Sequence, residues 1–398
     1  MITPNLPKYT ARIVDQLERN LDEEMAKYEL EKRKDGMILV ENPTLVIQLM
    51  IASSMAHLFV GPEIAKNDQV LDSFITATDD LGRIAGRGEI KKKSIWRTFL
   101  DNTEHRLLSP LQKHVDVLVK ASTPFVLERR RLEQQAMAAG HIYERSDDIL
   151  QRLLDDFEKY KMVDLEDICG NLIMLVLSGV HTTADASANM LYYLAAFPEC
   201  IDTLFEEQQE VLDTIQKERE QQRQVLIAKD EPIPENLNSS EDRALSATAI
   251  KRMIHMDSFV REIFRYRTEQ LSLAHRARRN VTLSNGMVIS KGVTAIINMK
   301  SVHQSHDQGE DVEKFRPWRF VGKSKTATKI GSDFLPFDMG KHACPGRFLA
   351  IQELKTIGLL MVSRYSKIEI QDPSKTQKIL RIRTGASYGT GLLFTSRQ

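Results

Sequence analysis

Cysteine is scarce in this chain of 398 residues, which contains only three. Cys169, Cys200 and Cys344 lie far apart and are odd in number, which is typical of a reducing compartment and argues against a disulfide framework. No two of them lie at the short spacing that a metal finger needs. Each cysteine therefore needs an explanation of its own.

Net charge and long apolar runs are also missing. Lys plus Arg and Asp plus Glu both number 55, so no overall basic field indicates nucleic acid. Residues 1–25 lack the apolar core of a signal peptide or membrane anchor. The longest apolar runs, such as LIMLVLSGV, are about half of the ~20 residues that span a bilayer. We therefore expect no nucleic-acid partner and no membrane-spanning segment in this chain.

The apolar spacing that is present predicts a mainly α fold with minor β. Apolar residues recur at helical spacing or fill helical stretches in several segments, which lie at about residues 7–30, 43–60, 67–86, 107–137, 198–225 and 246–267. After them the sequence alternates and turns at Asn285-Gly286, which indicates a β-hairpin. Residues 164–196 predict the central helix, because their middle is apolar on every side.

Cys344 lies in the segment FLPFDMGKHACPGRFLAIQELK, between a turn and an expected helix. If Pro345 is the first helical residue, Cys344 caps the helix and its sulfur faces the positive end of the helix dipole. Such a position favours the thiolate and suits an axial heme ligand. A cysteine nucleophile, which would need a nearby His and Asn or Asp, and an unreactive buried cysteine remain the alternatives from these residues alone.

The segment FDMGKHACPG resembles the heme-binding loop of the cytochrome P-450 family, F-x-x-G-x-R-x-C-x-G. Phe337, Gly340, Cys344 and Gly346 fall in register with it, and His342 stands where the family usually has Arg. The resemblance implies that Cys344 is the axial ligand of the heme iron and that Phe337 and Gly346 border the cofactor. It also implies that His342 meets a heme propionate.

Two further segments carry the resemblance. MDSFVREIFRYR places Glu262 and Arg265 at E-x-x-R spacing on one helix face, and FRPWRF resembles the family's P-E-R-F segment. The resemblance implies a structural network in which Arg319 joins this pair. In LAHRARR, Arg276 is expected to bind a propionate, with His275 as the second choice and a solvated Arg as the alternative.

The expected central helix contains SGVHTTADAS, which resembles the family's oxygen-activation stretch. The resemblance implies that Gly179 lets the helix approach the heme face and that Thr182 relays protons to bound dioxygen. Thr182 can donate a hydrogen bond to the Ser178 carbonyl, which would loosen the helix locally. His181 occupies the usual acid position, and it either takes part in proton delivery or is a hydrogen-bonded core residue.

The resemblance extends over nearly the whole chain and implies one P-450 domain, residues 1–398. The opening resembles a stretch well inside family members, so we expect this chain to lack their membrane anchor, first helices and early strands. By resemblance the protein would work at the cytosolic face of the endoplasmic reticulum membrane, although a chain without an anchor could be cytoplasmic.

The expected activity is that of a fungal-type heme-thiolate monooxygenase, an iron-containing oxidoreductase. It would insert one atom of O2 into a C–H bond of an apolar small molecule, in secondary metabolite (terpenoid, meroterpenoid or alkaloid) biosynthesis. Electrons would come from a separate NADPH-dependent reductase, because no flavin or nicotinamide pattern is present in the sequence. The alternative is a truncated, non-catalytic relative that binds heme poorly.

Overall fold

The structure is a computed structural model, and it describes residues 6–30, 36–86, 111–234, 237, 245–267, 272–380 and 388–397. The chain forms two compact units. Unit 1 comprises Met1–Thr10, Glu31–Asn42 and Ala186–Gln398, and unit 2 comprises Ala11–Leu30 and Pro43–Asp185. Helices α1 (Leu6–Glu29) and α8 (Leu165–Ala196) contribute residues to both units. The predicted class, mainly α with minor β, is confirmed.

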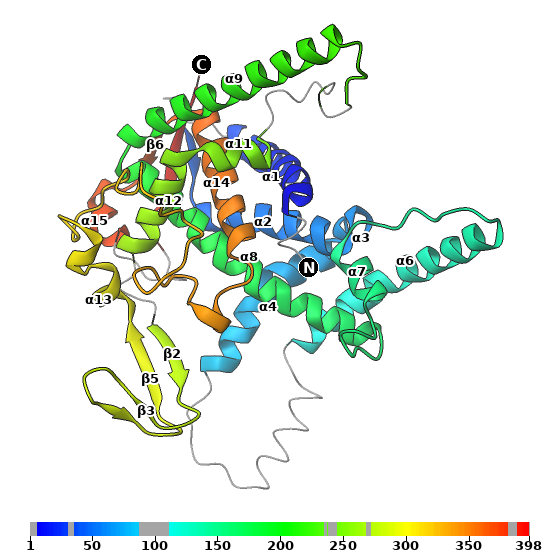
Figure 1. Ribbon diagram of the computed structural model, residues 1–398, viewed down its shortest axis with the longest axis horizontal. Coiled ribbons are helices and arrows are strands. Elements are labelled where there is room, and N and C mark those ends of the chain that lie inside the picture. Colours follow the sequence, from blue (N-terminus) through cyan, green and yellow to red (C-terminus); the bar gives the residue numbers. More distant parts are fainter. Residues whose placement is uncertain are drawn as a thin grey trace. The chain divides into compact units, whose positions relative to one another are not determined.

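Unit 2 contains helices and no strand in the part that the structure describes. Besides its shares of α1 and α8, it contains α2 (Pro43–Val60), α3 (Pro62–Ala65), α4 (Asp68–Gly86), α6 (Gln112–Ala138) and α7 (Ile149–Asp155). Helix α2 packs on α3, α4 and α7, and α4 packs on α6 (Figure 1). In α1, the predicted apolar row Ile13, Leu17 and Leu21 is buried. Its spacing of four residues places the three side chains on one helix face.

Several helices lie wholly within unit 1, and α14 packs on some of them. They are α9 (Glu199–Ala228), α11 (Ala247–Arg252), α12 (Ile254–Tyr266), α13 (Met299–His303), α14 (Arg347–Arg364) and α15 (Thr376–Ile379). Helix α14 contacts α9, α11 and α12. Leu354, Ile357 and Leu360 are among its many buried residues. Since α14 directly follows the cysteine loop, the core of unit 1 anchors that loop at its C-terminal end.

A small antiparallel sheet in unit 1 joins distant parts of the chain. It contains β1 (Ile38–Val40), β7 (Leu392–Ser396) and β6 (Tyr365–Ile370), in the order β1-β7-β6. Ile38 pairs with Phe394, and Ile368 pairs with Phe394 from the other side. Just before β7, a Cβ atom on Gly391 would lie 2.5 Å from the Val40 carbonyl oxygen, so only glycine fits there.

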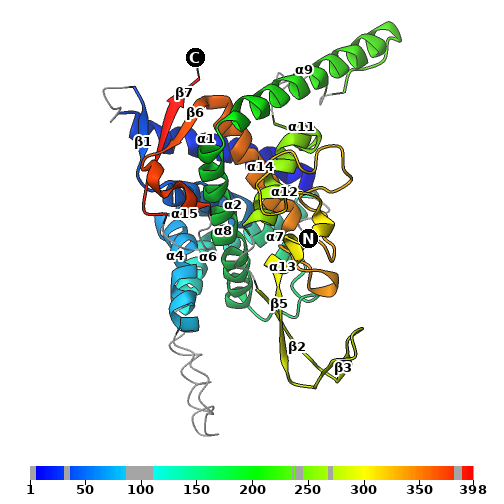
Figure 2. The ribbon, with the colours of Figure 1, turned by 90° about the vertical axis from the view of Figure 1, so that its left-hand side faces the viewer.

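The remaining strands form an arm of unit 1. Strand β2 (Ser272–Arg276) pairs with β5 (Thr294–Asn298), and β3 (Val281–Thr282) pairs with β4 (Val288–Ile289). The hairpin predicted at Asn285-Gly286 is confirmed. Gly286 has a φ of +83° and donates its N–H to the Leu283 carbonyl. Both ribbon views show this arm extending from α13, with β3 at its far end (Figure 1, Figure 2).

One predicted helix is divided. The helix expected over residues 246–267 consists of α11 and α12, which are separated at Met253 with its non-helical ψ of 85°. Glu207 of α9 accepts hydrogen bonds from the backbone N–H groups of His255 and Met256, at 2.6 and 3.0 Å. A carboxylate from another helix therefore satisfies the first N–H groups of α12 and fixes its start.

Among the described residues, α2 and α8 are long and apolar enough to cross a membrane. In the most apolar window of each, 67% of the α2 residues and 50% of the α8 residues are buried inside the protein. Core helices pass the same test, so these two are weak evidence for a membrane span.

Candidate functional site

The loop that carries Cys344 is held by its backbone. Gly340 begins a short 3-10 turn, Gly340–His342, with a φ of +64° that favours glycine. The N–H of Cys344 donates to the Phe337 carbonyl at 2.8 Å, which closes the loop. Cys344 is partly exposed, and no hydrogen bond to its sulfur is found among the described residues. The thiol is therefore free to bind a further group.

The prediction that Pro345 opens the following helix is wrong. Helix α14 begins at Arg347 with Gly346 as its N-cap, so Cys344 lies before the cap. One guanidinium nitrogen of Arg347 donates to the Cys344 carbonyl at 2.9 Å. The helix therefore holds the cysteine through this hydrogen bond, and the cysteine does not cap the helix. A Cβ atom on Gly346 would meet the Cys344 sulfur at 3.9 Å, an ordinary contact distance, so this glycine lies directly beside the sulfur.

The other two cysteines differ from Cys344 in their surroundings. Cys169 in α8 and Cys200 in α9 are both fully buried. Burial raises the pKa of each thiol to about 12. Both therefore remain protonated near neutral pH and pack as small apolar side chains. Cys344 is the one cysteine of the three that can reach a ligand.

Aromatic rings lie on both sides of the cysteine along the chain. The Phe337 ring packs against Phe264 of α12, with 5.5 Å between the ring centroids. On the helix side, the Arg347 guanidinium lies 4.3 Å from the centre of the Phe348 ring. The loop thus has apolar ring surface before and after Cys344.

His342 contacts β2. Its ring centroid lies 5.5 Å from that of His275, whose Nε2 lies 3.4 Å from Asp338 Oδ2. Arg276 is exposed, and its Nε donates to the Gly292 carbonyl at 3.2 Å. His275 and Arg276 are adjacent in β2, so their side chains point to opposite faces of the strand. In this structure the second choice, His275, is the one that lies beside His342. The propionate-binding role of each residue stays a prediction.

The structure brings Glu262, Arg265 and Arg319 together. Two nitrogens of Arg265 donate to the two Glu262 oxygens at 2.7 and 2.8 Å, and Arg319 Nε lies 3.0 Å from Glu262 Oε1. The Arg316 backbone N–H also donates to Glu262 Oε1, at 2.9 Å. All three charged side chains are buried. Through these hydrogen bonds and ion pairs, the Glu262 carboxylate ties α12 to the FRPWRF segment.

Sequence reasoning missed His303, which connects this network to the cysteine loop. The His303 carbonyl accepts from Arg265 at 3.1 Å, and its ring Nε2 accepts from the Leu335 backbone N–H at 2.8 Å. Burial, and then the Arg265 charge, lower the pKa of His303 to about 4. The ring is therefore neutral near pH 7, which leaves Nε2 unprotonated and able to accept this hydrogen bond. The available signal was its position between the E-x-x-R helix and FRPWRF.

The predicted oxygen-activation residues lie on α8, in unit 2. The Thr182 hydroxyl donates to the Ser178 carbonyl at 2.8 Å, and Thr182 is exposed. The helix nevertheless continues unbroken through this turn, so the expected local loosening is absent from α8. His181 is half-buried. A Cβ atom on Gly179 would meet Met55 Cε at an ordinary 3.8 Å. The roles of these residues stay predictions.

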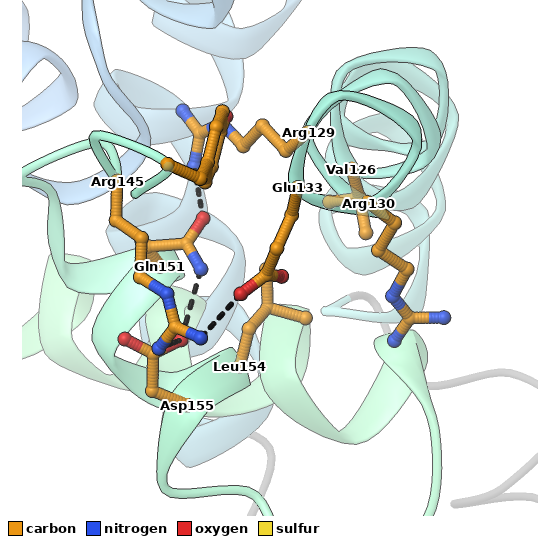
Figure 3. A pocket seen from close by; sticks show the side chains of 9 residues that line it. Val126, Arg129, Arg130, Glu133, Arg145, Gln151, Leu154 and Asp155 are labelled. Carbon is orange, nitrogen blue, oxygen red and sulfur yellow. Dashed lines mark hydrogen bonds and ion pairs between the residues drawn. The ribbon is translucent and has the colours of Figure 1, made fainter. Parts of the chain in front are cut away.

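A polar cavity lies between α6, α7 and the segment that joins them, in unit 2 (Figure 3). It has a volume of about 260 Å³, and no predicted site residue lines it. Arg145 forms ion pairs with Glu133 and, at 3.0 Å, with Asp155. Arg129 pairs with Asp148 at 2.6 Å. The cavity is therefore lined by paired charges, and such a lining does not suit an apolar substrate.

Unit 1 thus contains a cysteine loop that leads into α14 and a buried Glu–Arg–Arg network, as the resemblance to a heme-thiolate protein predicts. The chain matches the cytochrome P-450 family over residues 2–387, and it belongs to that family. It is 25% identical to cytochrome P-450 monooxygenase 151 of Postia placenta, over 98% of this chain and 76% of that protein. It is also 25% identical to monooxygenase paxP of Penicillium paxilli and 27% identical to TES1 of Alternaria alternata. Those matches cover 95% of this chain and 68% and 67% of the two proteins. Another relative, monooxygenase 71 of Postia placenta, is matched over only 50% of its own length.

The family's prosthetic group is heme held by a cysteine thiolate. The residues of unit 1 fit that group. Cys344 offers a partly exposed sulfur without a hydrogen bond in the described chain, and the imidazoles of His342 and His275 lie together in the same unit. The described residues contain no cluster of three or more His, Cys, Asp or Glu that could hold a metal ion. A single sulfur ligand to a porphyrin-bound iron needs no such cluster.

Proposed function

We propose that this protein is a heme-thiolate monooxygenase in which Cys344 is the axial ligand of the heme iron. The observation that carries the proposal is the contrast between Cys344 and the other two cysteines. Cys344 is partly exposed on a loop fixed by backbone hydrogen bonds, whereas Cys169 and Cys200 are buried. A ligand sulfur must be both reachable and held in place, and Cys344 meets both conditions.

Bound heme would supply the activation of dioxygen, and the chain would position the reactants and deliver protons. The Thr182 hydroxyl donates its own proton to the Ser178 carbonyl, which leaves its oxygen lone pairs able to accept from water. We infer that Thr182, with His181 one residue before it, holds and moves protons on the oxygen side.

In this proposal other residues of unit 1 hold the cofactor in place. His342 would donate to one propionate, with Arg276 or His275 as a second donor. Phe337 would lie against the porphyrin, and Gly346, which has no side chain, would let it approach the backbone. The Glu262 network would keep the scaffold rigid around the site.

The proposed substrate is an apolar small molecule of fungal secondary metabolism. One oxygen atom would enter a C–H bond, and the other would leave as water with two electrons from an NADPH-dependent reductase. The similarity to fungal monooxygenases supports this class, although the shared fold does not identify the substrate. We infer the cytosolic face of the endoplasmic reticulum membrane as the place of action.

The reduced, carbon-monoxide-bound spectrum of the purified chain tests the proposal. A thiolate ligand should give a red-shifted Soret band, and Cys344→Ser should abolish it. Cys200→Ala is the matched control, because that thiol is buried in α9 and should leave the band in place. An imidazole-like band or no bound heme in the unmodified chain would indicate the non-catalytic relative. A band that survives Cys344→Ser would refute the ligand assignment.

A further inference from the structure

Arg261 of α12 is a buried cation without an ion pair. It lies directly before Glu262 in the chain and is only 1% exposed. No carboxylate of the described residues lies within ion-pairing distance of its guanidinium. Burial lowers the pKa of Arg261 to about 10, and Asp333 and Asp257 only partly oppose this, so the group is charged near neutral pH. A buried charge without a carboxylate is costly unless other contacts compensate.

The contacts of Arg261 lie on the segment that leads to the cysteine loop. One guanidinium nitrogen donates to the backbone carbonyls of Thr326 and Lys329, at 2.6 and 2.9 Å. The guanidinium carbon lies 3.7 Å from the centre of the Phe334 ring and 4.9 Å from that of Phe320. A cation over an aromatic face is attracted by the ring electrons, and more strongly where water is excluded. Arg261 therefore ties this segment to α12.

Phe334 has a second ring partner. The His303 ring stacks on it, with 5.4 Å between the ring centroids and 25° between the ring planes. The Phe334 backbone closes a turn, in which its N–H donates to the Gly331 carbonyl at 3.0 Å. The next residue, Leu335, donates its N–H to the His303 ring. Side chain and backbone are therefore held together at Phe334, which is completely buried.

Helix α12 contacts this part of the chain at a second point. Phe264, whose ring packs against Phe337, lies three residues after Arg261. Residues three apart lie on the same face of a helix, so one face of α12 contacts both Phe334 and Phe337. The Phe337 carbonyl in turn accepts the hydrogen bond from the Cys344 N–H. These contacts connect Arg261 to the cysteine loop.

We propose that Arg261 is a positioning residue, which acts through Phe334 to fix Phe337 and thereby the backbone of Cys344. The charge matters because an apolar side chain could fill the same space but could not bind two carbonyls and a ring face together. Only the last step, the binding of heme iron by the positioned sulfur, rests on the proposed function.

Amide hydrogen exchange of the full chain tests the positioning. Arg261→Met removes the charge and the donors and keeps an unbranched apolar side chain. The amides of Phe334, Leu335 and Cys344 should then exchange about tenfold faster, because the contacts that hold the segment open more often. Arg261→Lys keeps a cation over the ring and should stay within about threefold of the unmodified chain.

Phe334→Leu tests whether the effect passes through this ring. It removes the ring and keeps an apolar side chain, so exchange at Cys344 should rise about as much as in Arg261→Met. The double variant should be at most about twofold faster than either single variant, because both changes remove the same contact. Unchanged exchange at Cys344 in Phe334→Leu, or effects that multiply in the double variant, would overturn the proposal. Phe334→Leu also decides the question if Arg261→Met does not fold.

Arg129→Met is the matched control. Arg129 is a largely buried arginine of α6 in unit 2, and it pairs with Asp148. The same chemical change there should alter exchange at Cys344 by less than about twofold, because it removes no contact of the cysteine loop. An acceleration equal to that in Arg261→Met would indicate general loosening of the fold and would contradict a positioning role.

The reduced, carbon-monoxide-bound spectrum provides a readout at the sulfur itself. Arg261→Met should move part of the red-shifted Soret band to the shorter wavelength of heme without a thiolate ligand, and Arg261→Lys should restore it. A complete thiolate band in Arg261→Met would show that the sulfur does not depend on Arg261, which refutes the proposal. If the unmodified chain has no red-shifted band, the proposed function fails, and the exchange measurements alone decide the role of Arg261.

Discussion

The neutral, buried His303 should make the protein sensitive to mild acid. Its ring Nε2 accepts from the Leu335 backbone N–H, and the side chain is completely buried. Arg265 and Arg261 disfavour its protonation, and the nearby Asp333 only partly opposes them. Protonation would replace the acceptor by a donor and place a further positive charge beside two arginines. We therefore expect His303 to bind a proton at lower pH in the folded protein than in the unfolded chain.

The size of the effect follows from the two pKa values. The pKa of His303 falls from 6.5 to about 4 on folding, so the unfolded chain binds the proton first as the pH falls. The contribution of His303 to stability is complete above pH 6.5 and is lost as the pH falls toward 4. Linkage gives a loss of about 2 kcal/mol between pH 7.5 and pH 5, and about 3 kcal/mol when the loss is complete.

The test compares the unmodified chain with His303→Gln, whose amide oxygen can accept from the Leu335 N–H but does not titrate in this range. Urea unfolding at pH 7.5 and pH 5 gives the free energy of unfolding for each protein. The difference between the two pH values should be about 2 kcal/mol smaller in His303→Gln. Other histidines titrate in both proteins and cancel in the comparison. Parallel pH profiles would refute the reasoning, because His303 would then take up a proton without cost.

Three other changes test the remaining structure. Arg319→Ala should lower the free energy of unfolding by about 3–5 kcal/mol, because Glu262 loses a buried partner; a loss below 1 kcal/mol in urea would contradict the network. Gly391→Val should reduce the thermal midpoint by several degrees, because its Cβ would lie 2.5 Å from the Val40 carbonyl. An unchanged midpoint would be inconsistent with that contact. Thr182→Ala should raise the O2 consumed per product formed, and an unchanged ratio would argue against a proton relay.

Local patterns predicted most of the helices. Helices can be recognised from a short stretch of sequence, because a helix is closed by hydrogen bonds between near neighbours. Examples are the row Ile13, Leu17 and Leu21 and the apolar stretch at Pro43–Val60. The strands β1, β6 and β7 were not predicted. Three residues such as Ile38–Val40 become a strand only because a distant segment pairs with them, and no local spacing shows that partner.

The candidate site was likewise predicted where its residues lie in short motifs and missed where it depends on distant contacts. Motif spacing located Cys344 and the Glu262 network, because those residues lie in short recognisable segments. It misplaced the start of α14, since hydrogen bonds from Cys344 to Phe337 and from Arg347 to Cys344 hold the loop and helix end in place. It also missed His303, whose importance depends on a bond to a backbone group far along the chain.

The pairing of Ile38 with Phe394 has a consequence for synthesis. Val40 of β1 pairs with Leu392 of β7 although 352 positions separate them in the sequence, so β1 is synthesised long before its partner. Until β7 follows, the nascent chain holds an unpaired apolar strand, and binding to a chaperone in that period would prevent aggregation. A stop codon shortly before Leu392 would remove β7 and leave β1 without its neighbour in the sheet.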